Sequence, residues 1–432
     1  MPDIHSDAPT PPSTGASDAL LDLLKTTYEK VTSSHIELGA VSIFDAVDSP
    51  DPEVFHEAFS QLNDAAAGIV GTLIADARFP GNTVVQICRE GGASGFYPNF
   101  IVMPLLRAAT AKGGAREAVS WLEKVFATTS AQGKIFHAIW GAPVDNEIAL
   151  TEEISIVPIA ALPDSAIKTW LTEHRVNSPV SSMLDFISPQ SALIVPFYVP
   201  RVLHKPGIDP DPSSVEYLRV NDLLNDATLA LSAVGPRVTT LAVQWFAFDD
   251  PDLELTAFGT GSRGQLMEIL PSQPPQYPKL DGVEAADIVR RFLNLPADVK
   301  KKIRVTLNRL QQAQKRRTLG DRCVELSTAF ETLLGDNKAT EMTHKIKVRS
   351  VRLLGGSPEI RRHNAAVMGW MYDARSKLVH TGEDVTKGKA INGEVLSPAV
   401  LVERATSICT EIVKRLIREG VIPDWADFDI LA

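Results

Sequence analysis

The segment Pro271-Ser-Gln-Pro-Pro-Gln-Tyr-Pro278 divides this chain of 432 residues into two parts with different patterns. Four prolines in eight residues cannot lie inside a helix or a central strand, because proline has a fixed backbone and no N–H to donate. Helical and strand-like patterns alternate before this segment, and only helical ones follow it. We therefore expect a mixed α/β or α+β domain at residues 19–270, a proline-rich linker at 271–282 and an all-α helical bundle at 283–432.

The part before the linker mixes two periodicities. Residues 1–18 are rich in Pro, Ser, Thr and Ala, which predicts a disordered tail. Apolar residues at helical spacing predict helices over 18–34, 53–76, 116–128 and 215–233. Runs of β-branched and aromatic residues between turn signals predict strands over 83–88, 134–140, 147–159, 192–199, 237–248 and 253–258. The order of these strands in a sheet stays open.

The part after the linker has helical spacing throughout. The predicted helices span 286–293, 298–317, 321–334 and 341–354, and two more begin at the Ser-Pro pairs 357–358 and 397–398. A capping serine followed by a proline in the first turn is a typical helix start. Short turns between amphipathic helices predict an up-and-down bundle.

The composition is that of a globular protein, with 44% apolar and 22% charged residues. Cys88, Cys323 and Cys409 are far apart and form no C-x-x-C pair, so we expect reduced, buried thiols and neither a disulfide framework nor a metal site. No apolar run reaches the roughly 18 residues that a spanning helix needs, and no signal-peptide pattern begins the chain. We expect a cytoplasmic protein with no membrane partner.

The net charge of −10 conceals a division between the two parts of the chain. Residues 1–296 hold 19 Lys and Arg against 36 Asp and Glu, whereas residues 297–432 hold 24 against 17. The basic residues of the second part cluster at 300–302, 315–317, 345–352 and 361–362. Such a field attracts the phosphates of RNA. The clusters are equally compatible with solvated helix faces, or with an acidic first domain that packs on the basic one.

One stretch of the second part, Met371-Tyr-Asp-Ala-Arg375-Ser-Lys-Leu-Val-His380-Thr-Gly382, combines groups that can cleave RNA. The reaction needs a group that takes the 2′-hydroxyl proton, a group that protonates the leaving oxygen, and a cation on the phosphorane. Histidine can transfer either proton, and the arginine fork fits phosphate oxygens.

The spacing of this pair sets a geometric condition. Five residues of continuous helix leave Arg375 and His380 about 140° apart. The two converge only if the helix ends between them, which Thr381-Gly382 favours, or if two subunits face each other. In a purely structural interpretation, Arg375 pairs with Asp373 or Glu331 and His380 caps a helix.

The amino-acid sequences of two segments resemble motifs of the HEPN superfamily, and of its ApeA-like branch in particular. Glu325-Leu-Ser-Thr-Ala-Phe-Glu331-Thr-Leu-Leu334 is similar to an early helix of that branch, and Tyr372-Asp-x-Arg375-Ser-Lys-Leu-Val-His380 is similar to its signature. The resemblance covers about residues 298–420. It implies a HEPN-like bundle that forms a homodimer, with one composite RNA-cleaving site that uses no metal and no cofactor. It also implies a place in toxin or antiviral-defence systems.

Carried over to this chain, the resemblance assigns Arg375 to phosphate stabilisation and His380 to acid–base catalysis. Asp373 and Glu331 would hold or orient the arginine, and Ser376 stands where many members have Asn, Asp or His. From the basic clusters we expect RNA to contact five further residues: Lys377, Arg361, Arg362, Lys345 and Arg349.

The same resemblance leaves a second interpretation open. A non-catalytic HEPN module would bind RNA, a nucleotide or a protein partner. In either case the first domain would receive a regulatory ligand or protein.

Overall fold

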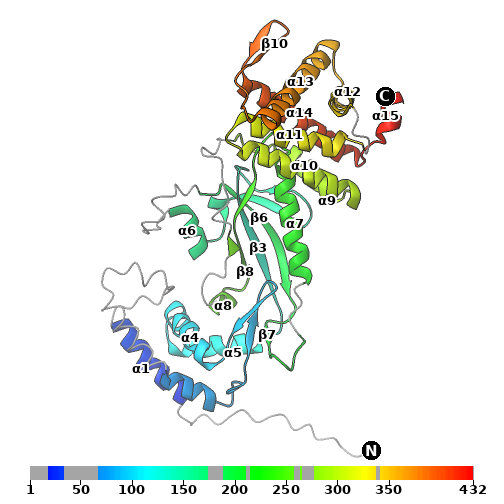
Figure 1. Cartoon of the computed structure of the whole chain (residues 1–432). Helices are drawn as coiled ribbons and strands as arrows, with labels where there is room; N and C mark the ends of the chain where they lie inside the picture. The colour runs from blue at the N-terminus through cyan, green and yellow to red at the C-terminus, as the bar shows by residue number, and fades with distance from the viewer. Residues whose placement is uncertain are drawn as a thin grey trace, which may run out of the picture. The chain divides into compact units, whose positions relative to one another are not determined.

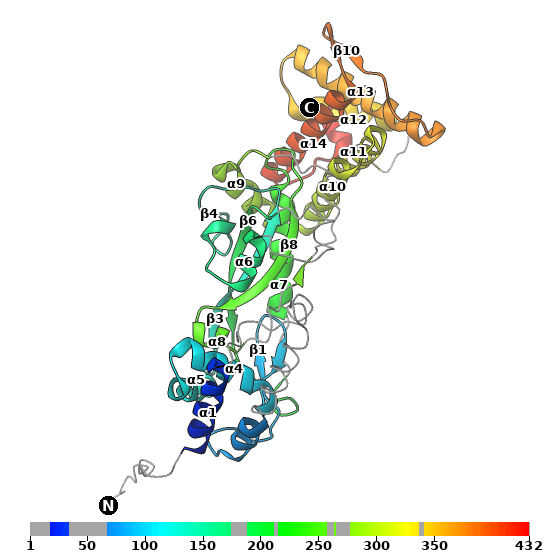
Figure 2. The ribbon, with the colours of Figure 1, turned by 90° about the vertical axis from the view of Figure 1, so that its left-hand side faces the viewer.

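The computed structural model describes seven ranges of the chain, namely residues 18–33, 67–173, 188–210, 215–256, 263–264, 277–336 and 341–431. The described part is a mixed α/β structure whose C-terminal region is helical (Figures 1 and 2). The tail expected at 1–18 lies outside it except for Asp18. Residue contacts divide the chain into two compact units. The first comprises 1–132, 198–213 and 248–259, and the second comprises 133–197, 214–247 and 260–432.

The first unit combines a small antiparallel sheet with helices. The sheet has the strand order β2-β1-β7, from Ala93–Gly95, Gln86–Cys88 and Leu203–His204. The helices are α1 (Ala19–Ser33), a helical stretch at 67–75, α4 (Pro98–Lys112), α5 (Ala115–Ala127) and α8 (Pro251–Glu254).

The strand predicted at 253–258 is wrong over its described residues, because helix α8 occupies the start of this stretch. Asp250 caps α8, since its side chain accepts a hydrogen bond from the N–H of Asp252. Pro251 then provides the fixed backbone that suits the first helical position. Residues 257–258 lie outside the described ranges.

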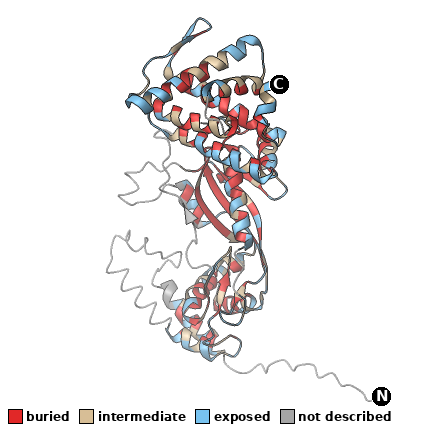
Figure 3. Ribbon diagram, turned by 45° about the vertical axis from the view of Figure 1, so that its right-hand side comes forward, coloured by how far each residue is buried: buried red, intermediate tan, exposed pale blue. Residues whose placement is uncertain are grey.

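A six-stranded sheet forms the centre of the second unit, in the order β4-β5-β6-β3-β8-β9. Its strands are β3 (Ala131–Trp140), β4 (Ile148–Ala149), β5 (Ser155–Pro158), β6 (Ser191–Val199), β8 (Thr240–Phe248) and β9 (Arg263–Gly264). Apolar side chains of one sheet face, among them Phe136 and Trp245, pack on Leu171 of α6 (Ala166–Glu173). Helix α7 (Val215–Leu231) contacts the sheet through the hydrogen bond between Tyr217 and Gln244, and burial marks the resulting core (Figure 3).

The helical region follows with α9 (Gly282–Leu293), α10 (Ala297–Lys315), α11 (Leu319–Leu334), α12 (Met342–Leu354), α13 (Pro358–Thr381), α14 (Pro398–Glu419) and α15 (Trp425–Leu431). A hairpin of β10 (Lys389–Ile391) and β11 (Glu394–Leu396) separates α13 from α14. The predicted Ser-Pro starts are confirmed, because Ser357 and Ser397 accept hydrogen bonds from the N–H groups three residues later.

The compact units do not separate at the predicted linker. Most of the sheet belongs to the same unit as the helices after 282, because α7 packs on α9 and α10. The described part of the predicted linker is also attached to the sheet region. Tyr277 accepts a hydrogen bond from the N–H of Val238 (3.0 Å), and Leu280 donates one to Pro143 (2.9 Å). The packing of α7 on α9 and α10 therefore joins residues from both sides of the proline-rich segment.

Candidate functional site

Helix α13 carries both residues of the predicted pair and continues past them. It ends at Thr381, where Gly382 adopts a left-handed conformation (φ 71°) and donates its N–H to Leu378. The expectation that the helix ends between Arg375 and His380 is wrong, because the hydrogen-bonding pattern persists to this glycine cap. The two side chains therefore project about 140° apart from the same helix. One chain does not bring them to one reacting atom.

Arg375 is half-buried beside a buried tyrosine on the same helix. The Nε atom of Arg375 is buried and has no hydrogen-bond partner within the described ranges, and the buried hydroxyl of Tyr372 lies beside the carboxylate of Glu331. Burial raises the pKa of Tyr372 strongly, the nearby negative charge of Glu331 raises it further, and Arg375 acts in the opposite direction. Glu331, Tyr372 and Arg375 thus form one group, the Arg375 cluster, across α11 and α13.

The ion pairs of the purely structural interpretation are not formed. In the described part of the chain, neither Asp373 nor Glu331 has a carboxylate oxygen within 4.0 Å of a nitrogen of Arg375. Asp373, Ser376 and His380 are exposed to solvent. The structure therefore places Glu331 and Arg375 each beside Tyr372 and leaves Asp373 and Ser376 on the surface of the helix.

The segment after His380 is held against α11. A carboxylate oxygen of Asp384 accepts a hydrogen bond from the backbone N–H of Gly320 at 2.6 Å. Trp370 donates its indole N–H to the carbonyl of Lys387 at 3.1 Å. The sequence reasoning missed Gly320 and Asp384, although the glycine at the start of a predicted helix was a signal of a close approach.

Arg349 corrects one predicted RNA contact. Its side chain is only 1% exposed, and its Nη2 atom lies 2.8 Å from Asp336 and 2.7 Å from Asp429. The guanidinium also lies over the ring of Trp425. Arg349 joins three segments of the fold and is not accessible to RNA.

The other four predicted RNA contacts differ in their surroundings. Lys345 is ion-paired with Asp336 at 3.1 Å, and Lys377 is ion-paired with Glu383 at 2.9 Å. Arg361 and Arg362 are exposed at the start of α13. Arg361 donates to the carbonyl of Gly356, and its charge is not neutralised by that contact.

Comparison of the chain with protein-family models, with curated proteins and with solved structures found no match. Among the residues that the structure describes, no helix combines the length and the apolar character that crossing a membrane requires. The same residues contain no group of three or more His, Cys, Asp or Glu side chains placed to hold a metal ion. The site is therefore characterised by its own geometry.

Proposed function

We propose that this protein is a HEPN-type, metal-independent endoribonuclease, regulated as a toxin or antiviral-defence effector, that works as a homodimer. The proposal rests on the burial and the hydrogen bonding of Arg375. Its guanidinium is held half-buried in the Arg375 cluster with an unpartnered Nε atom, on the same helix as the exposed His380. A cation that forms no ion pair with the described residues is available to an anionic phosphate group.

One chain does not bring Arg375 and His380 to one reacting atom, whereas a dimer of two chains can. In a two-fold interface each subunit presents the same surface to the other. The last turns of α13 expose Lys377, Val379 and His380, and Val379 is a 55% exposed apolar side chain. Pairing of two such helices would place Arg375 of each chain near the partner's His380.

The proposed reaction needs only these side chains and the RNA. One imidazole takes the proton of the 2′-hydroxyl, and the 2′-oxygen attacks the adjacent phosphorus. The guanidinium of Arg375 stabilises the charge on the phosphorane. The bond between phosphorus and the 5′-oxygen then breaks, and the second imidazole, in its protonated form, gives a proton to the leaving oxygen. The products are a 2′,3′-cyclic phosphate and a 5′-hydroxyl end.

The exposed basic residues supply attraction for the RNA backbone. Arg361 and Arg362 are exposed, and Arg362 has one long ion-pair contact of 3.9 Å, with Glu359 on the same helix. Arg316 and Lys300, in contrast, are ion-paired with Glu325 and Asp226. Only part of the positive charge counted in the sequence is therefore available to phosphates. Cleavage should weaken as salt concentration rises, because RNA binding releases counterions.

The test is cleavage of total RNA in EDTA by the full-length protein and by Arg375→Ala and His380→Ala variants. The matched controls are Arg290→Ala and His344→Ala, since both residues are exposed and lie on other helices. We expect cleavage with 2′,3′-cyclic phosphate ends by the parent protein and by both controls, and a loss of at least 100-fold in the two site variants. Equal activity in site and control variants, or no cleavage by any of them, overturns the proposal.

A second candidate function is that of a non-catalytic HEPN module that binds RNA, a nucleotide or a protein partner. The observation in its favour is the separation of Arg375 and His380 on a continuous α13. Its signature is RNA binding, measured by fluorescence anisotropy, that weakens in an Arg361→Ala/Arg362→Ala variant while no cleavage accompanies it.

A further inference from the structure

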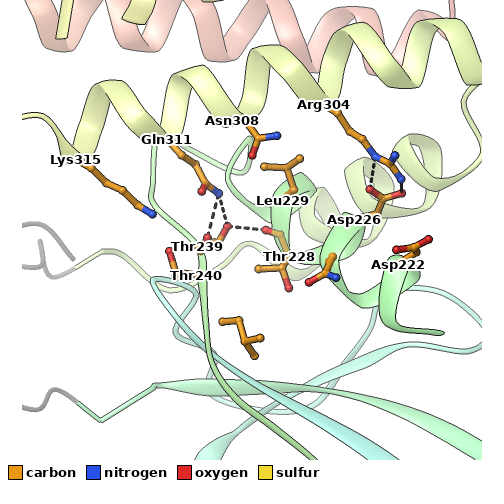
Figure 4. Close-up of a pocket in the computed structure, with 12 residues that line it drawn as sticks. Asp222, Asp226, Thr228, Leu229, Thr239, Thr240, Arg304, Asn308, Gln311 and Lys315 are labelled. Carbon is orange, nitrogen blue, oxygen red and sulfur yellow. Dashed lines mark hydrogen bonds and ion pairs between the residues drawn. The ribbon is translucent and has the colours of Figure 1, made fainter. Parts of the chain in front are cut away.

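A polar pocket of about 340 Å³ lies inside the second unit, between α7, the start of β8 and α10 (Figure 4). Its volume falls in the range of small-molecule sites. The lining residues come from these three elements: Asp222, Asn225, Asp226, Thr228, Leu229, Thr239, Thr240, Leu241, Arg304, Asn308, Gln311 and Lys315.

One wall of the pocket is a single face of α10. Arg304, Asn308, Gln311 and Lys315 follow each other at intervals of four, three and four residues, which places them on one side of a helix. Figure 4 shows these four side chains directed from α10 toward α7 and β8. From the first to the last they span about 16 Å along the helix axis. The wall is long enough for a ligand of one or two sugar rings.

Hydrogen bonds connect the elements that form the walls of the pocket. Arg304 donates to both carboxylate oxygens of Asp226, at 2.6 Å each. Gln311 donates its side-chain N–H to the carbonyl of Thr239 at 3.0 Å. Because these groups already engage each other, the shape of the site exists before any ligand binds.

The other polar side chains of the lining indicate which ligands the pocket can bind. The lining includes the carboxylate of Asp222 and the side-chain amides of Asn225 and Asn308, and all three residues are exposed. Together these groups both donate and accept hydrogen bonds.

The charge and shape of the lining select among ligand classes. The lining carries two carboxylates and two cations, so its formal charge is zero and it does not favour an anion. None of the described residues that line it is aromatic, so it offers no stacking surface for a nucleobase. Neighbouring hydroxyls of one molecule can donate to a carboxylate and accept from an amide at the same time.

We propose that this pocket is a binding site for a neutral, polyhydroxylated small molecule of monosaccharide or disaccharide size. Asp222 accepts from two of its hydroxyls, and Asn225 and Asn308 both donate and accept. This site is separate from the Arg375 cluster, and the proposal does not depend on RNA cleavage.

The experiment is isothermal titration calorimetry of the full-length protein with D-ribose, D-glucose and sucrose as probes. The test variants are Asp222→Asn and Asn308→Asp, which change hydrogen-bonding groups and preserve side-chain shape. Asp164→Asn is the control, because Asp164 is a fully exposed carboxylate of the same unit. We expect saturable binding of at least one probe, with a Kd raised about tenfold in each test variant and unchanged in the control.

Two further titrations and an unfolding measurement make the result decisive. Triglycine and AMP test a zwitterionic and a nucleotide ligand, and thermal unfolding of each variant checks that the fold is intact. If Asn308→Asp unfolds early, Asn225→Asp takes its place. The proposal is overturned if no sugar binds saturably, if triglycine or AMP binds in place of the sugars, or if sugar binding is the same in folded test variants and in the control.

Discussion

A carboxylate oxygen of Asp384 lies 2.6 Å from the backbone nitrogen of Gly320 and accepts its hydrogen bond. This contact connects the segment that follows α13 to the first turn of α11, across 64 residues of sequence. The C-terminal end of α13, with His380, is therefore positioned by a residue of another helix.

Replacement of Gly320 by alanine should weaken this connection. A Cβ atom at this position would lie 2.8 Å from the Asp384 oxygen and 3.0 Å from Leu378 Cδ2, closer than normal contacts. We expect Gly320→Ala to lower the free energy of unfolding by about 1–3 kcal/mol, measured by urea denaturation. Gly369→Ala is the control, since its nearest neighbour is a flexible lysine at 3.9 Å. Equal effects of the two substitutions would contradict this account.

The contacts of Arg349 predict a structural and not an RNA-binding role. Arg349→Met should lower the free energy of unfolding by about 2–3 kcal/mol, because Asp429 loses its ion pair and the Leu334 carbonyl loses its donor. The comparison is Arg361→Met, which changes an exposed side chain and should alter stability by less than about 0.5 kcal/mol. Denaturant unfolding measures both. A larger effect at Arg361 would refute the assignment.

His137 predicts a dependence of stability on pH. Complete burial lowers its pKa from 6.5 to about 4, and the hydrogen bond that its Nδ1–H donates to Gln244 Oε1 opposes this only partly. Between these two values the unfolded chain binds more protons than the folded one, so the free energy of unfolding falls as the pH falls from 6.5 to about 4. The contribution of neutral His137 is complete above pH 6.5.

The measurement is urea unfolding at several pH values for the parent protein and for His137→Gln. The variant should have a shallower slope between pH 4 and 6.5, by up to about 1.4 kcal/mol per pH unit. His344→Gln, at an exposed position, should keep the slope of the parent. An unchanged slope in His137→Gln would show that this histidine does not contribute.

Mixing of the parent protein with an inactive variant tests whether the nuclease site is shared between chains. Arg375→Ala/His380→Ala chains, unfolded and refolded with parent chains, should form mixed dimers that hold one Arg375 and one His380. Because the proposed reaction uses one imidazole from each chain, we expect mixed dimers to be inactive, so that RNA cleavage falls as the square of the parent fraction. Cleavage that falls in direct proportion to the parent fraction, with mixed dimers demonstrated by mass spectrometry, would place the site within one chain.

The elements set by local signals were predictable from the sequence, and those set by distant partners were not. Ser357 and Ser397 cap their helices with atoms three residues away, so a short window of sequence contains the whole cause. The apolar content of residues 253–258 predicted a strand. The capping carboxylate of Asp250, which precedes this stretch, favours a helix there instead.

The candidate site divides in the same way. Arg375 and His380 were recognisable from one short stretch, but the continuity of the helix through Thr381 depends on the glycine that follows. The burial of Arg349 could not be predicted from the sequence, because its partner Asp429 lies 80 residues further along the chain. A cluster of positive charge in a sequence gives no sign of which members are already paired.

The contact of Asp226 and Arg304 has a consequence for how this protein can be divided. Helix α10 belongs to the helical region by sequence, yet one of its faces is completed by α7 and by residues before β8. A fragment that begins at residue 283 would expose Gln311 and leave Arg304 without its carboxylate. We therefore expect that the helical region does not fold stably by itself. The shortest stable fragment with the proposed nuclease site would also contain the sheet, which takes no part in the chemistry.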